Sequence, residues 1–418
     1  MKSRKLFLKI TYEKRRLFKP VIKFFLFRLI LSRSITIIPL LMKLYKLNTL
    51  LILICFVFQY CSKEVAVNTT ERERWTKEKA SEWYRSQPWL VGANYIPGYA
   101  INQLEMWQAA TFDTVAIEKE FVLAENLGMN TMRVFLHDLL HQQDSIGFYM
   151  RINTFLRIAD RHKIKPMLVF FDSVWDPFPA LGKQRDPKPF VHNSGWVQSP
   201  GINGIKDASN YPRLEAYVKG TILKFRNDSR ILSWDLWNEP DNINGVYREN
   251  EVFPNKVDYV IPLLTKSFQW AREAHPIQPL TCAIWSGNWV SDATMRPVEK
   301  LQIEQSDFIT FHNYGSPGDF EQIIQWLQRY GRPLVCTEYM ARTNGSTFQS
   351  FLPIAKKYNV GMYNWGFVEG KTQTIFPWDS WNLPYTSEPA TWFHDIFRKD
   401  GTPYRTEETN FIRNIIKS

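Results

Sequence analysis

The sequence predicts an α/β fold, a single (β/α)8 TIM barrel over residues 86–418. From Leu90 onward, eight short β-rich runs alternate with amphipathic helical stretches. The last four of these units recur about every 26 to 28 residues, close to the length of a minimal βα unit. No glycine-rich phosphate-binding turn follows any run, which disfavours an open doubly wound sheet.

The predicted strands are short runs of β-branched and aromatic residues. They are Leu90–Ile96, Asn130–Leu136, Pro166–Phe171, Ile231–Trp237, Leu280–Trp285, Phe308–Tyr314, Leu334–Tyr339 and Gly361–Phe367. The first predicted helix, Phe112–Leu127, repeats apolar residues every three to four positions and is followed by Gly128 as its C-cap. Further helices are predicted at Ile146–Arg161, Arg213–Phe225, Lys256–Ala274, Phe320–Tyr330, Phe348–Tyr358 and Thr391–Arg398, with a weaker pattern at 291–304.

Long loops are predicted after strands 3, 4 and 8, where the chain between neighbouring elements is longest. In (β/α)8 barrels such insertions lie at the C-terminal ends of the strands, where sites are built. The third loop, Asp172–Asn210, contains Trp175 and a group of prolines at 177, 179, 187 and 189. It either covers one end of a cleft or packs on itself. The loop after strand 8 carries the polar and aromatic residues Glu369, Lys371, Trp378 and Trp381.

The N-terminal part of the chain is expected to lie outside the barrel domain. Residues 42–61 have a short basic start, an apolar run of 14 residues and a final Cys61, which together predict an export signal. Cys61 resembles the acylated cysteine of a bacterial lipoprotein, although the residues before it are bulky; a cleaved signal or a short anchor is the alternative. Residues 1–41 form an upstream segment, since translation can also begin at Met42, and 62–85 form a polar tether.

The charge distribution argues against a polyanionic partner. The formal net charge is +11, but residues 1–50 hold 13 Lys/Arg and one acid, so the rest of the chain is nearly neutral. We therefore expect the protein to be a monomer without a nucleic-acid partner. We expect it to contact a membrane only through an anchor at Cys61. Seven scattered histidines without a ligand motif predict no metal and no cofactor. Cys282 and Cys336 lie on non-adjacent predicted strands and are expected to be buried thiols.

Two carboxylates end predicted strands on nearly opposite sides of the barrel. Pro240 terminates the fourth strand and leaves Glu239 at its C-terminal end, with Asn238 beside it. Glu338 ends the seventh strand at the equivalent level. Both side chains are expected to point into one pit. Paired carboxylates suit glycoside hydrolysis, because the leaving oxygen needs a proton donor and the anomeric carbon needs a second group facing it.

These motifs resemble glycoside hydrolase family 5, the cellulase-like barrels of the retaining clan. The resemblance rests on Trp237-Asn238-Glu239-Pro240 and Thr337-Glu338, and extends over about residues 88–400. Further matching segments are Asn130-Thr131-Met132-Arg133-Val134-Phe135, Phe311-His312-Asn313-Tyr314 and Asn364-Trp365-Gly366. The resemblance implies that Glu239 is the acid/base and Glu338 the nucleophile.

The resemblance also implies substrate-binding residues around this pair. Asn238 is expected to bond the sugar 2-hydroxyl, Tyr314 to hold Glu338, and Trp365 to form a sugar platform. The other candidates are Arg133, His312, Asn94, Trp175 and Trp378.

The sequence departs from the family at the third strand, where many members carry a histidine. Phe171-Asp172-Ser173 stands there instead, and His137-Asp138 is a candidate to take its place.

The leading functional hypothesis is an exported retaining β-glycosidase that acts on a β-1,4-linked glucan, mannan or xylan. The alternatives are a catalytically idle carbohydrate-binding barrel and a transglycosylase that uses the same carboxylates. The sequence leaves open which polysaccharide is cut, and whether it is cut internally or from an end.

Overall fold

The structure is a computed structural model that describes residues 72–418. The predicted upstream segment, signal peptide and first part of the tether therefore lie outside the described residues. Within the described part, no helix has the length and apolar character needed to cross a membrane.

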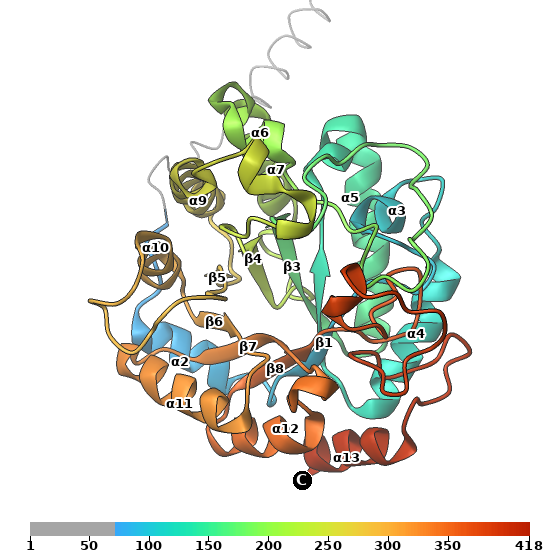
Figure 1. Cartoon of the computed structure of the whole chain (residues 1–418). Helices are drawn as coiled ribbons and strands as arrows, with labels where there is room; N and C mark the ends of the chain where they lie inside the picture. Colours follow the sequence, from blue (N-terminus) through green and yellow to red (C-terminus); the bar gives the residue numbers. More distant parts are fainter. Residues whose placement is uncertain (1–71) are drawn as a thin grey trace, which may run out of the picture. The chain divides into compact units, whose positions relative to one another are not determined.

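Eight parallel strands form the barrel, in the order β5-β4-β3-β2-β1-β8-β7-β6, and helices surround them (Figure 1). A parallel bridge between Ile284, shortly after β5, and Phe311 of β6 closes the ring. The strands are β1 Val91–Tyr95, β2 Thr131–Phe135, β3 Lys165–Asp172, β4 Ser233–Asn238, β5 Leu280–Thr281, β6 Ile309–His312, β7 Leu334–Tyr339 and β8 Gly361–Asn364. The predicted (β/α)8 barrel is confirmed, with every predicted strand in its place.

The fifth strand is much shorter than predicted. The ladder with β4 ends at Thr281, whereas the prediction extended to Trp285. Beyond it the backbone turns toward β6, where Ile284 N–H donates to the carbonyl of Thr310 and the carbonyl of Ile284 accepts from His312 N–H. This departure carries Trp285 out of the barrel wall and toward the mouth.

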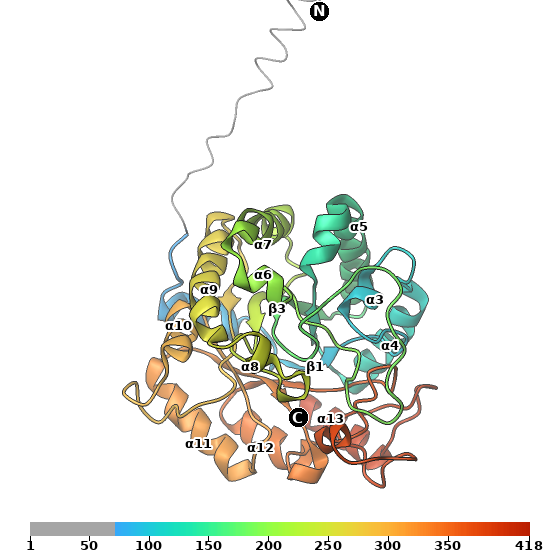
Figure 2. The same ribbon diagram turned by 45° about the horizontal axis from the view of Figure 1, so that its top comes forward.

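Outer helices cover the strands on all sides (Figure 2). They are α2 Lys77–Arg85, α3 Gln103–Trp107, α4 Thr114–Leu127, α5 Asp138–Arg161, α6 Ile202–Lys206, α7 Tyr211–Phe225, α8 Glu249–Val252, α9 Lys256–Glu273, α10 Pro297–Gln305, α11 Pro317–Leu327, α12 Phe348–Lys357 and α13 Thr406–Lys417. Gly128 ends α4 with φ 83°, as its predicted role of C-cap requires. Helix α5 starts earlier than predicted and is broken at Asp144.

The prediction of a last helix at Thr391–Arg398 is wrong. Trp392, Phe393, Ile396 and Phe397 are all buried, so this segment has no exposed face of the kind an amphipathic surface helix needs. Its backbone instead pairs with Phe367 at the end of the eighth βα unit. The chain ends in α13, which packs against α4 and α12.

Helix α2 closes the N-terminal end of the barrel. Trp83 packs on Phe308 at 5.0 Å between ring centroids, Tyr84 is buried, and Arg72 pairs with Asp307 at 2.7 Å. Through these contacts, residues 72–85 of the predicted tether pack against the barrel.

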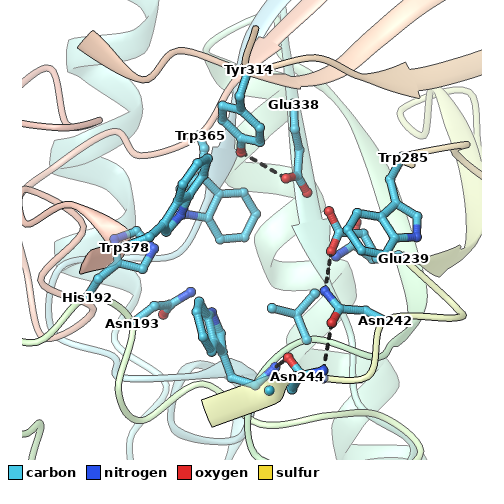
Figure 3. A pocket seen from close by; sticks show the side chains of 14 residues that line it. His192, Asn193, Glu239, Asn242, Asn244, Trp285, Tyr314, Glu338, Trp365 and Trp378 are labelled. Atoms are coloured by element: carbon cyan, nitrogen blue, oxygen red, sulfur yellow. Dashed lines mark hydrogen bonds between the residues drawn. The ribbon is translucent and has the colours of Figure 1, made fainter. Parts of the chain in front are cut away.

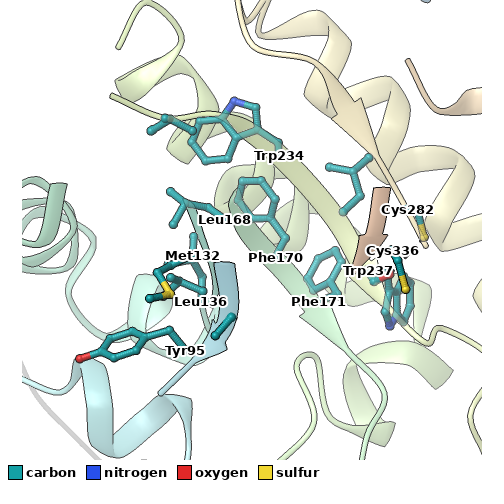
Figure 4. Close-up of a cluster of buried hydrophobic side chains, with 14 of the residues drawn as sticks. Tyr95, Met132, Leu136, Leu168, Phe170, Phe171, Trp234, Trp237, Cys282 and Cys336 are labelled. Carbon is teal, nitrogen blue, oxygen red and sulfur yellow. Dashed lines mark hydrogen bonds between the residues drawn. The ribbon is translucent and has the colours of Figure 1, made fainter. Parts of the chain in front are cut away.

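The apolar core lies between the strands and the surrounding helices. Figure 4 shows part of it, with buried side chains from β1 to β4 that include Tyr95, Met132, Leu168, Phe170 and Trp234. Cys282 and Cys336 are buried free thiols, as predicted. The barrel interior is polar toward its C-terminal end, where a buried arginine and several carboxylates gather.

Candidate active site

The structure brings Glu239 and Glu338 into one cavity at the C-terminal end of the barrel (Figure 3). Glu338 lies in β7, and Glu239 directly follows β4 with φ 45°, a left-handed conformation at the turn before Pro240. One oxygen of each carboxylate and a ring nitrogen of His312 lie within 4.8 Å of one another. The shared pit predicted from the sequence is therefore present.

Glu338 is held by one charged and one neutral donor, from β2 and from the end of β6. Nη1 of Arg133 donates to its Oε1 at 3.0 Å, and the hydroxyl of Tyr314 donates to its Oε2 at 2.9 Å. Burial keeps the pKa of Tyr314 well above its ordinary value, so this hydroxyl stays protonated and remains a donor. These contacts favour a negatively charged Glu338.

Glu239 has neutral neighbours. Nδ2 of Asn242 donates to its Oε2 at 2.7 Å, and a hydrogen bond of 3.0 Å joins its Oε1 to Nδ1 of His312. Burial lowers the pKa of His312 to about 4, so the imidazole is uncharged at neutral pH. No cation contacts Glu239 directly among the described residues, in contrast to the arginine on Glu338.

Burial raises the pKa of Glu239 to about 7, and it raises that of Glu338 to about 7 as well. Two buried carboxylates this close do not both ionise readily, so the pair holds one proton over a range of pH. The guanidinium and the phenol contact Glu338, and we therefore place the charge on Glu338 and the proton on Glu239. This arrangement places one protonated and one ionised carboxyl group side by side at the same pH.

Arg133 lies beneath the carboxylates and is completely buried. It pairs with Asp235 at 2.8 Å, donates to Oδ1 of Asn94 at 2.9 Å, and donates to Oδ1 of Asn238 at 2.8 Å. Neither Arg133 nor Asn94 lines the cavity that holds the carboxylates. Both were predicted to bind substrate, and the structure places them as supports of the site instead.

Asp172 occupies the position at which many family members carry a histidine. Its carboxylate accepts from Nδ2 of Asn238 at 3.0 Å and from the indole of Trp196 at 2.6 Å, and burial raises its pKa to about 7. His137, the predicted substitute, is fully buried and caps α5 next to Asp138, so it does not reach the cavity. Asp172 itself orients Asn238, which lines the cavity.

The cavity has a volume of about 370 Å³, and tryptophans line it from several directions. Trp365 follows β8, Trp175 comes from the loop after β3, and Trp378 comes from the loop after β8. The three predicted tryptophans therefore meet in one place. Flat aromatic rings of this kind suit the C–H faces of sugars.

A second hollow of about 360 Å³ adjoins the first at Glu239, Trp285 and Tyr314. His312 lines this second hollow, together with Trp289. Glu239 borders both hollows, whereas Glu338 borders only the first.

Trp285, Asn242 and Asn193 are among the cavity residues that the sequence did not single out. Trp285 was assigned to the barrel wall, and its indole instead donates to Asp241 at 2.7 Å, next to Glu239. Asn242 stands three residues after Glu239, and only this proximity in the sequence hinted at its contact. Asn193 lies in the middle of a long loop, where no local pattern distinguishes it.

A cation is disfavoured at the carboxylates. Glu239, His312 and Glu338 are the group of possible metal ligands found in the described part of the chain. The guanidinium of Arg133 already lies 3.0 Å from Glu338 and repels a second positive charge.

No protein-family model and no curated protein sequence matches the chain. Solved structures do match it with a probability of 1.00. The exo-beta-1,4-mannosidase Op5Man5 from Opitutaceae bacterium strain TAV5 superposes with a TM-score of 0.53 at 18% identity, over 78% of this chain and 59% of that one. A GH5_18 protein from Streptomyces cattleya in complex with GlcNAc gives 0.51 at 10% identity, over 79% and 80% of the two chains.

The chain shares the barrel fold of family 5 glycoside hydrolases. A variant of the Streptomyces cattleya protein, in complex with Manb1-4GlcNAc, superposes with a TM-score of 0.52 at 12% identity. At these identities the likeness establishes the fold. The present chain spans about three fifths of the length of the Opitutaceae enzyme.

Proposed function

We propose that this protein is a retaining β-glycosidase that hydrolyses β-1,4-linked glycans. The observation that carries the proposal is the pair Glu239 and Glu338, with oxygens within 4.8 Å of each other in a cavity lined by tryptophans. Retaining glycosidases separate their carboxyl groups by about 5–5.5 Å, whereas inverting enzymes leave about 6.5–9.5 Å for a water molecule. The short separation therefore supports a double displacement.

In the first step, Glu338 attacks the anomeric carbon while Glu239 protonates the leaving oxygen. A covalent glycosyl ester forms at Glu338, and the bond to the leaving sugar breaks. In the second step, the ionised Glu239 takes a proton from water, which attacks the ester and releases the sugar with its configuration retained. Arg133 and Tyr314 stabilise Glu338 as the leaving carboxylate of this second step.

The two hollows fit the two sides of the bond that is cut. The nucleophile must face the ring whose anomeric carbon reacts, and Glu338 borders only the first hollow. The acid must reach the oxygen between two sugars, and Glu239 borders both. The first hollow is therefore assigned to the sugar that forms the ester, and the second to the leaving group.

An activity panel tests this proposal. Purified residues 72–418 are assayed on β-1,4-linked mannan, glucan and xylan oligosaccharides and on the matching aryl β-glycosides, beside the Glu338→Ala variant. Mannosides come first, because two of the three structural neighbours named above carry beta-1,4-mannosidase or Manb1-4GlcNAc in their descriptions. Release of sugar by the wild type and its loss in the variant is the expected result. Binding without any release by the wild type supports an idle carbohydrate-binding barrel, and transfer to added sugar acceptors supports a transglycosylase.

We also propose that the chain is exported and that Cys61 anchors it to a bacterial membrane through a lipid. The basic start and apolar run of 42–61 support this proposal. Expression of the full chain in a bacterium with radiolabelled palmitate is expected to label the wild type but not Cys61→Ser. Equal labelling of the two proteins, or none in either, contradicts acylation at this cysteine.

A further inference from the structure

The first hollow is closed on the side away from the leaving group. The loop after β3 crosses to the loop after β8, and backbone and side-chain hydrogen bonds join the two. Gln373 accepts from Phe190 N–H at 2.8 Å and donates to the carbonyl of Lys188 at 2.7 Å. His192 N–H donates to the hydroxyl of Ser380 at 2.9 Å. We call these two joined loops the wall.

Aromatic side chains reinforce the wall. Trp175 stacks on Trp381 with ring centroids 5.3 Å apart and an interplanar angle of 21°. Trp196 fills the space behind Trp365, 5.7 Å from it, and is 1% exposed. Only a residual space of about 10 Å³ remains over β1 and β2. A sugar chain therefore has no continuous path past Trp365 in that direction.

The wall presents a buried amide that has no protein partner. Asn193 is 1% exposed, lines the first hollow, and neither its Oδ1 nor its Nδ2 finds a hydrogen-bond partner in the described protein. Figure 3 shows its amide directed toward the space between the tryptophans. Buried polar groups in native proteins are almost always hydrogen-bonded, so an unpaired one calls for an explanation.

The backbone holds this amide in position. Asn193 has φ 48°, a left-handed conformation, and its N–H donates to the carbonyl of Thr372 in the opposite loop at 2.7 Å. Asparagine is one of the few residues besides glycine that adopt this conformation readily. Asn193 is therefore fixed by both halves of the wall, with its side chain free for a ligand.

We infer that the protein removes single sugars from the non-reducing end of its substrate, and that Asn193 binds hydroxyls of that terminal sugar. The inference rests on the proposed function. With the anomeric carbon at Glu338, the C4 end of the pyranose ring lies farthest from the carboxylate and faces the wall. A β-1,4 chain extends from O4, so the wall that blocks extension is also where a terminal hydroxyl is recognised. The cavity volume of about 370 Å³ is at the small end of the range for ligand pockets, about 300–1,000 Å³.

Product analysis tests the mode of cleavage. The substrate is a hexasaccharide of whichever β-1,4 glycan the panel selects, labelled at its reducing end. The expected early products are an unlabelled monosaccharide and a labelled pentasaccharide, and a 4,6-O-ethylidene group on the terminal sugar is expected to stop the reaction. Labelled products of several lengths from the first time point, or turnover of the blocked substrate, overturn the inference while leaving the glycosidase proposal intact. Absence of turnover on every substrate in the panel overturns both.

A double-mutant cycle tests the role of Asn193. The wild type and Asn193→Ala are compared on an aryl β-glycoside and on its 3-, 4- and 6-deoxy analogues. The substitution is expected to lower kcat/KM about tenfold on the parent glycoside and to have little further effect on one of the deoxy analogues, because both changes remove the same hydrogen bond. Asn313→Ala, in the second hollow, is the matched control and is expected to show no such coupling. Equal losses on all four substrates contradict sugar binding by Asn193 and indicate a structural role.

Discussion

The carboxylates on the two sides of the barrel mouth have different hydrogen-bond partners. On the β7 side, Glu338 accepts from a guanidinium and from a phenol. On the β4 side, Glu239 contacts an uncharged imidazole and an amide. Burial raises both pKa values to about 7, so burial alone does not distinguish the two carboxylates. The difference lies in the donors: Glu338 contacts a buried cation, and Glu239 contacts none among the described residues.

The arginine that makes this difference is itself neutralised by a third carboxylate. Arg133 pairs with Asp235, and both are fully buried. The guanidinium therefore brings a positive charge to Glu338 without leaving an unpaired buried cation, which carries a desolvation cost of several kcal/mol.

Loss of Glu338 is expected to have the largest effect on activity. Glu338→Ala removes the group that forms the ester, so kcat/KM is expected to fall by about 10⁴-fold or more on every substrate, whatever its leaving group. Steady-state assays on aryl glycosides with leaving groups of different pKa measure this. Substantial activity in the variant refutes the assignment of the nucleophile.

Loss of Glu239 is expected to depend on the leaving group. A general acid contributes about 10²–10⁴-fold, but a 2,4-dinitrophenolate leaves without protonation. Glu239→Ala is therefore expected to lose most activity on oligosaccharides and to retain ester formation from a dinitrophenyl glycoside, seen as a pre-steady-state burst. Added azide, which needs no general base, is expected to speed its turnover. Equal losses on both substrate classes, without a burst, assign Glu239 another role.

Removing one hydrogen bond from each carboxylate is expected to shift opposite limbs of the pH profile of kcat/KM. Tyr314 lowers the pKa of Glu338, so Tyr314→Phe raises that pKa and moves the acid limb of kcat/KM to higher pH. The expected loss is about 10- to 100-fold below neutral pH, since a hydrogen bond to a charged group is removed.

Asn242→Ala provides the matched change on the other carboxylate. Asn242 lowers the pKa of Glu239, so its removal is expected to move the alkaline limb to higher pH and leave the acid limb in place. A shift of the same limb of the pH profile in both variants contradicts the different assignments of Glu338 and Glu239.

The smallest expected effect is on stability. The folded pKa of each carboxyl group, about 7, lies above its ordinary value of 4.5, so between these pH values the native state binds more protons than the unfolded state. The free energy of unfolding therefore falls as pH rises through this window. Glu239→Gln is expected to raise Tm at pH 8 relative to the wild type, by about 2–4 °C for each kcal/mol recovered, and to have little effect near pH 4. Thermal melts at the two pH values check this; an unchanged or lower Tm at pH 8 contradicts the burial argument.

Residues fixed by strand geometry could be predicted from the sequence. Glu239 was found because Pro240 must end its strand, and Glu338 because parallel strands end at one level. Thr391–Arg398 could not be judged correctly, since its apolar spacing resembles a helix but both of its sides are covered in the fold. The pattern gives no information about what covers a segment.

Residues fixed by contacts between distant loops could not be predicted. Asn193 takes its position from a hydrogen bond to Thr372, which is far away in the sequence. Arg133 was identified correctly as part of the site but was assigned to the substrate. Its place beneath the carboxylates follows from side-chain packing inside the barrel, which strand order alone does not determine.

Trapping of the covalent intermediate tests the double displacement most directly. A 2,4-dinitrophenyl 2-deoxy-2-fluoro-β-glycoside of the preferred sugar slows both steps, and its good leaving group lets the ester accumulate. Intact mass and peptide mapping are expected to show one glycosyl group per chain, attached to Glu338 and absent from Glu338→Ala. An adduct on another residue, or hydrolysis of the natural substrate with inversion at the anomeric carbon, contradicts a nucleophilic Glu338.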